Sequence, residues 1–79
     1  MKKNFSRNLH FLGSKIRSLR KSNGFTLEEV SIRCIQINPD IAPSISYLSL
    51  IETSRRLPSK KLLEMLAGIF QKDIDWFFD

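Results

Sequence analysis

Small hydroxyl side chains and basic side chains are concentrated in one stretch, "SISYLSLIETSRRLPSKK", at residues 44–61. Hydroxyl and guanidinium groups donate hydrogen bonds, and arginine and lysine neutralise anions such as phosphates. The chain has one histidine and one cysteine, so no triad or metal cluster can be built around a second histidine. Its three glycines are scattered, so they do not form a glycine-rich phosphate loop. The stretch therefore favours recognition of a partner over catalysis, and we expect no enzyme activity and no cofactor.

Residues 44–53 show the periodicity of a helix with two unlike faces. If Leu48 faces the core, then at about 100° per residue Ile51 and Glu52 lie beside it. The opposite face carries small hydroxyl side chains and a leucine, without any charge: Ser46, Ser49, Leu50 and Thr53. A solvated helix face usually carries lysine and glutamate, whereas small side chains allow close approach to base edges in the major groove. An ordinary helix surface is the alternative.

The formal net charge of +5 is unevenly distributed along the chain. Residues 73–79 contain three acids and no base. Residues 1–27 contain no acid, and their basic residues are Lys2, Lys3, Arg7, Lys15, Arg17, Arg20 and Lys21. This asymmetry favours an anionic partner, with nucleic acid as the leading candidate and a solvated basic face as the alternative.

The first half of the chain predicts two helices. Apolar periodicity predicts a helix over residues 9–22, which Gly24 ends. Thr26 and Glu29 have the spacing of a capping box, which starts a second helix that should end near residues 35–36.

The second half predicts three more helices. Ser44 and Ser59 are N-caps for a third and a fourth helix, and Asp73 for a short fifth one. No alternating strand pattern occurs. The sequence therefore predicts a compact all-α domain of five helices over residues 9–79, preceded by a flexible basic N-terminus at residues 1–8.

Cys34 lies on the predicted inward face of the second helix, so we expect a core residue, with a reactive or intermolecular thiol as the alternative. No apolar run is long enough to cross a bilayer, and the first residues lack the apolar stretch of a signal peptide. We therefore expect a cytoplasmic protein without a membrane partner.

Three segments carry a family resemblance over residues 12–78: "LGSKIRSLRKSNGFTLEEVS", "SYLSLIETSRRLPSKKLLEMLAGIF" and "DWFF". The motif I-R-x-L-R before G-x-T-L-x-E, followed by YLS-x-IE and R-x-P-S, resembles the Cro/phage-repressor-type (Xre) helix-turn-helix family. The resemblance implies a lambda-repressor-like DNA-binding domain. It also implies a sequence-specific transcriptional regulator of double-stranded DNA, in the form of a small homodimeric repressor.

The resemblance also implies residue roles. The third helix is the recognition helix, and its base-reading residues are Ser44, Ile45, Ser46, Tyr47, Ser49 and Leu50. The residues implied to bind phosphates are Thr26, Arg55, Arg56 and Lys60. Arg20 and Glu52 match the family's structural ion pair between the first and third helices.

Two features depart from the family pattern. The connection "IQINPDIAPSI" is longer than usual and lacks glycine, so either the second helix extends or a loop of about seven extra residues forms. Gln36 and Asn38 in it are candidate DNA contacts. Ser54 replaces the usual glycine, and a left-handed serine there costs about 1 kcal/mol.

The adjacent aromatics Trp76, Phe77 and Phe78 cannot all point inward from one short helix. They either complete the core or form the dimer interface, because small repressors pair about a two-fold axis to contact two half-sites.

Two other functions stay open. One is a protein-interaction module, such as an antitoxin-like partner of a second protein, that uses the long connection and the aromatic C-terminus. The other is a nonspecific nucleic-acid binder driven by the basic N-terminal half.

Overall fold

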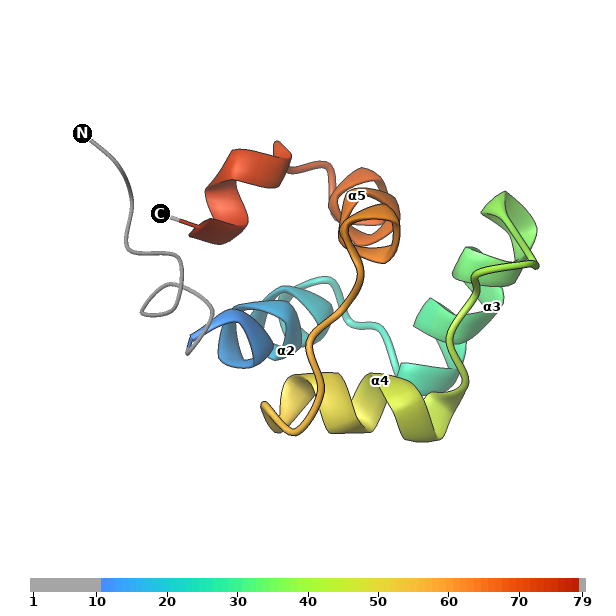
Figure 1. Ribbon diagram of the computed structural model, residues 1–79, viewed down its shortest axis with the longest axis horizontal. Helices are drawn as coiled ribbons and strands as arrows, with labels where there is room; N and C mark the ends of the chain where they lie inside the picture. The colour runs from blue at the N-terminus through green and yellow to red at the C-terminus, as the bar shows by residue number, and fades with distance from the viewer. Residues whose placement is uncertain (1–10, 79) are drawn as a thin grey trace.

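The computed structural model describes residues 11–78, which form four α-helices and one 3-10 helix without any strand (Figure 1). The elements are α2 (Leu12–Ser22), α3 (Leu27–Ile37), α4 (Ile45–Glu52), α5 (Lys60–Ile69) and η1 (Ile74–Phe78). The predicted all-α class is confirmed for this part of the chain. The predicted short fifth helix is a 3-10 helix of five residues. The predicted flexible segment 1–8 and the expected start of the first helix lie outside the described residues.

Three of the predicted helix starts, those of α3, α4 and α5, are confirmed by side-chain hydrogen bonds. Thr26 Oγ1 accepts from Glu29 N at 3.0 Å, and Glu29 Oε1 accepts from Thr26 N at 2.8 Å, which completes the capping box of α3. Ser44 and Ser59 each accept from the backbone N–H three residues on, at 3.1 Å, and so cap α4 and α5. These bonds satisfy donors that the first turn of a helix leaves unpaired.

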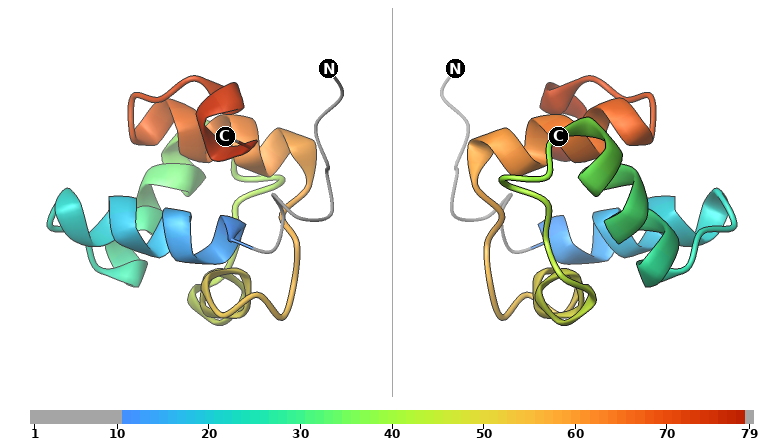
Figure 2. Two further views of the ribbon diagram at one scale, coloured as in Figure 1. Left: turned by 90° about the vertical axis from the view of Figure 1, so that its left-hand side faces the viewer. Right: turned by 90° about the vertical axis from the view of Figure 1, so that its right-hand side faces the viewer.

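The helices place α4 at one edge of the molecule. Figures 1 and 2 show α4 on one side of α2, and α5 with η1 on the other side. The core lies between them and consists of Leu12, Ile16, Val30, Cys34, Leu48, Ile51, Leu62, Leu63, Met65, Leu66, Ala67, Phe70 and Phe77. The predicted inward face of α4 is confirmed, since Leu48 and Ile51 are each 1% exposed and Glu52 is buried with them.

Cys34 is fully buried, as expected of a core residue. Burial raises the pKa of its thiol to about 11. The thiol is therefore protonated at neutral pH and poorly reactive.

Gly13 allows α2 to pass directly over the C-terminal end of α4. A methyl group at Gly13 would overlap the carbonyl oxygens of Ile51 and Glu52, at 2.8 Å from the second of these. The sequence analysis did not single out this position, because the approach involves a segment 38 or more residues away.

The connection between α3 and α4 matches neither alternative fully, because residues 38–44 are seven in all and not seven extra. The helix runs to Ile37, one residue further than predicted, and residues 38–44 form the rest of the connection. The Asn38 side chain accepts a hydrogen bond from the backbone N–H two residues on, at 3.1 Å. Ser31 Oγ on α3 donates to the Pro43 carbonyl at 2.8 Å in a buried position. The bond from Ser31 therefore anchors the second half of the connection to α3, whereas the Asn38 bond lies within the connection.

Among residues 11–78, three residues in turns have left-handed backbones. Ser54 has φ +64°, so this turn keeps the left-handed backbone that the sequence analysis placed in doubt for a serine, and Gly24 has φ +72° after α2. Gln71, with φ +57° after α5, carries no such sequence signal.

The aromatic residues of η1 correct one prediction. Phe77 is 0% exposed and belongs to the core, so its assignment to a dimer interface is wrong. Trp76 and Phe78 are half-buried. The Trp76 ring has Lys15 Nζ at 5.1 Å and Lys72 Nζ at 5.0 Å from its centroid. The core-wrapping alternative is thus confirmed for Phe77.

Candidate nucleic-acid interface

The outward face of α4 presents small side chains at the edge of the molecule. Ser46 and Ser49 are exposed, Leu50 is half-buried, and Ile45 is 46% exposed. Because the opposite face of α4 packs in the core, these side chains can contact a partner while α4 stays packed against the rest of the domain. The structure thus brings together four of the six predicted base-reading residues on one accessible helix.

The remaining two base-reading candidates have structural contacts. The Ser44 hydroxyl accepts the N-capping hydrogen bond from Tyr47 N at 3.1 Å, which leaves its proton and one lone pair available to a partner. Tyr47 is half-buried and packs against the core. Both therefore lie at the margin of the face rather than in its centre.

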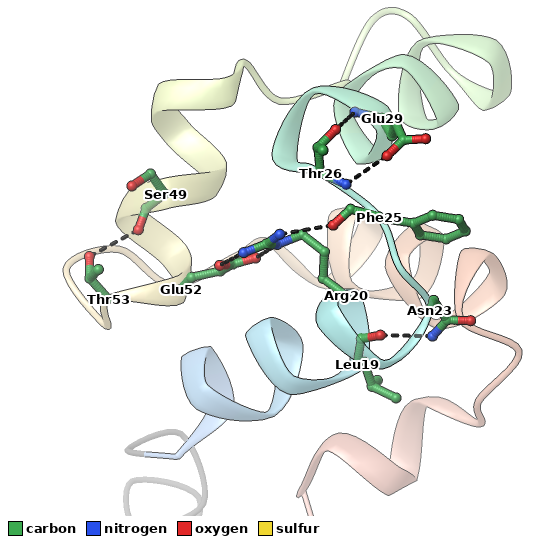
Figure 3. A network of polar contacts seen from close by, with 9 residues as sticks. All are labelled: Leu19, Arg20, Asn23, Phe25, Thr26, Glu29, Ser49, Glu52 and Thr53. Carbon is green, nitrogen blue, oxygen red and sulfur yellow. Dashed lines mark hydrogen bonds and ion pairs between the residues drawn. The ribbon is translucent and has the colours of Figure 1, made fainter.

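Arg20 and Glu52 form the predicted ion pair. Arg20 Nε lies 2.7 Å from Glu52 Oε2, and Arg20 Nη2 lies 3.0 Å from Glu52 Oε1 (Figure 3). A third guanidinium nitrogen, Nη1, donates to the Phe25 carbonyl at 2.9 Å. The hydrogen bond to Glu52 raises the pKa of Arg20, although partial burial opposes the rise. One side chain thus ties α2 to α4 and to the residue just before the N-cap of α3.

The start of α3 does not favour a phosphate at Thr26. The Thr26 N–H donates to the Glu29 carboxylate, as Figure 3 shows, and Glu28 adds a second carboxylate in the same turn. The hydrogen bonds from Thr26 lower the pKa of Glu29, so this carboxylate is ionised at neutral pH. The helix end already holds an anion of its own, and the predicted phosphate contact at Thr26 is therefore not supported.

The predicted basic residues separate into two groups. Arg55 and Arg56 are exposed, and their backbone N–H groups donate to Leu50 O at 2.8 and 3.3 Å, so they stay at the end of α4. Lys60 begins α5, which lies across α2 from α4 (Figure 2). It lines a pocket of about 350 Å³ together with Asp75 of η1. The structure therefore does not bring Lys60 to the α4 face.

The sequence analysis did not identify a group of polar residues on α2 as a possible site. Ser14, Arg17, Ser18 and Lys21 line a shallow pocket of about 370 Å³ beside Glu52. The signal that was available is their spacing of three, four and seven residues, which places them on one side of a helix.

Within residues 11–78, no group of three histidine, cysteine or acidic side chains could hold a metal ion. No helix in that range is long and apolar enough to cross a membrane.

Searches of protein-family models, of curated proteins and of solved structures found no match to this chain.

Proposed function

We propose that this chain is a sequence-specific DNA-binding transcriptional regulator. In this proposal α3, residues 38–44 and α4 form a helix-turn-helix of the lambda-repressor-like kind, and α4 enters the major groove. The proposal depends above all on the uncharged outward stripe of α4, which lies at the edge of the molecule. The family resemblance of the sequence motifs supports it.

The side chains of this stripe suit base edges. Serine hydroxyls donate or accept hydrogen bonds, so Ser46 and Ser49 can pair with purine and pyrimidine groups. Leu50 and Ile45 supply apolar contact for a thymine methyl group. Arg55 and Arg56, at the end of α4, bind flanking phosphates.

We further propose that the protein acts as a homodimeric repressor. A helix of eight residues contacts few base pairs, and a two-fold dimer doubles the contacted sequence. Half-sites about 34 Å apart then match the symmetry of the protein. Of the three predicted interface aromatics, Trp76 and Phe78 remain candidates, because Phe77 is buried in the core.

The test is selection of binding sites from a random duplex pool at about physiological salt, where nonspecific phosphate binding is weakened. We expect enrichment of a pseudo-palindrome. The variant Ser46→Glu should then bind the selected duplex at least about 100-fold more weakly, because a carboxylate is repelled by the groove.

The matched control is Gln71→Glu, which adds the same charge at an exposed position after α5. Both variants should unfold at the urea concentration of the wild type. Failure to enrich any sequence, or equal binding by Ser46→Glu and Gln71→Glu, would contradict the proposal.

A protein-interaction module is the second candidate, favoured by apolar side chains on α3. Ile32 and Ile35 are 47% and 50% exposed, and Ile37 at the helix end is 58% exposed. If the wild type binds no duplex, this function becomes the preferred one. Duplex binding without enrichment would instead indicate a nonspecific nucleic-acid binder.

A further inference from the structure

The exposed side of α2 carries two cations and two hydroxyls in one row. These residues, Ser14, Arg17, Ser18 and Lys21, line one wall of the shallow pocket whose other wall is Glu52 of α4. All four side chains are exposed. The α2 sequence, "LGSKIRSLRKS", contains no acid, so Glu52 is the one carboxylate among the lining residues.

The row adjoins the outward face of α4. On α2, Gly13 and Arg20 face α4, and at about 100° per residue Arg17 is the next position toward solvent. On α4, Ser49 is likewise the next position outward from Glu52. A surface in contact with Ser49 is therefore within reach of Arg17.

The charge of Glu52 does not make this surface unfavourable for an anion. Both of its carboxylate oxygens already accept hydrogen bonds from Arg20. With that pair neutralised, the two remaining charges beside the pocket are those of Arg17 and Lys21. The start of α3 differs in this respect, because Glu28 and Glu29 leave it negative.

We propose that Arg17 and Lys21 bind backbone phosphates of the duplex strand that borders the groove occupied by α4, with the Ser14 and Ser18 hydroxyls as further donors. This inference rests on the proposed function and assigns to α2 the phosphate contacts that the structure does not support at Thr26 and Lys60. Phosphate contacts of this kind position a protein on DNA without selecting a sequence.

The test compares two double variants that remove the same charge. Arg17→Ala/Lys21→Ala changes the proposed surface, whereas Lys60→Ala/Lys61→Ala removes two exposed cations from the start of α5. Affinity for the duplex selected by the wild type is measured over a series of salt concentrations, and urea unfolding establishes that both variants are folded.

We expect the α2 variant to reduce the slope of log affinity against log salt by about 2, because each phosphate contact contributes about 0.9. Its affinity should fall by about tenfold or more for every duplex, while the selected sequence stays the same. The α5 variant should keep the wild-type slope.

Equal slopes for the two double variants would overturn the inference, since the effect would then come from net charge alone. A change in the selected sequence would also overturn it, because Arg17 or Lys21 would then contact bases. In both cases the wild type still selects a site, so the proposed function survives. If the wild type binds no duplex, both fail.

Discussion

Replacing Glu52 with alanine removes both carboxylate oxygens that Arg20 contacts, at 2.7 and 3.0 Å. The side chains of the pair are only 13% and 6% exposed, so water replaces these contacts poorly. Arg20 keeps its hydrogen bond to the Phe25 carbonyl, but its charge loses the Glu52 carboxylate paired with it. We therefore expect Glu52→Ala to weaken the attachment of α4 to α2.

The magnitude follows from the geometry. Breaking a buried ion pair by removing one partner costs about 3–5 kcal/mol. The cost here should lie lower, at about 2–3 kcal/mol, because Arg20 retains one partner and some access to water. For a domain of this size such a loss lowers Tm by about 10–20 °C.

The assay is thermal and urea unfolding followed by circular dichroism at 222 nm. Glu64→Ala is the matched control, since Glu64 is an exposed glutamate on α5. The double variant Arg20→Met/Glu52→Leu replaces the pair with apolar side chains and should cost less than the sum of the single variants Arg20→Met and Glu52→Leu. If Glu52→Ala shifts the midpoint no more than Glu64→Ala does, or if the double variant is additive, the pair does not hold these helices together.

Two further predictions concern buried positions. Gly13→Ala should destabilise the fold by about 1–3 kcal/mol through overlap with the end of α4, whereas Gly68→Ala, with open space around it, should stabilise α5 by up to about 1 kcal/mol. Urea midpoints measure both changes, and a neutral Gly13→Ala would show that α2 can move away from α4. Cys34, with its raised pKa of about 11, should react with a thiol reagent at pH 8 only as fast as the protein unfolds. Rapid labelling of the native protein would show that the thiol is accessible.

Local chemistry made several features predictable. The hydroxyl residues that begin helices were identifiable because each is followed by a helical pattern, and the structure shows their capping bonds. The two faces of α4 followed from helical periodicity alone. The left-handed backbone of Ser54 was not predictable in this way, because a serine there costs about 1 kcal/mol and a different turn would avoid that cost.

Features that depend on distant packing were not predictable. Lys60 is five residues beyond Arg55 in sequence, yet the intervening chain carries it past α2. Phe77 and Trp76 are neighbours with equal apolar character, and only the docking of η1 decides which one is buried. The missing phosphate site at Thr26 could have been predicted from the sequence. The capping box places the Glu29 carboxylate at the start of α3, where a phosphate would otherwise bind.

The docking of η1 also provides an optical signal. Trp76 is the single tryptophan of the chain, and its half-buried indole lies where η1 packs against α2 and α5. Its fluorescence emission therefore shifts to longer wavelength when η1 detaches and water reaches the ring. Loosening of α4, at the opposite edge of the molecule, changes helical ellipticity but leaves the surroundings of this indole intact. Emission and circular dichroism recorded on one sample thus distinguish detachment of η1 from loosening of α4.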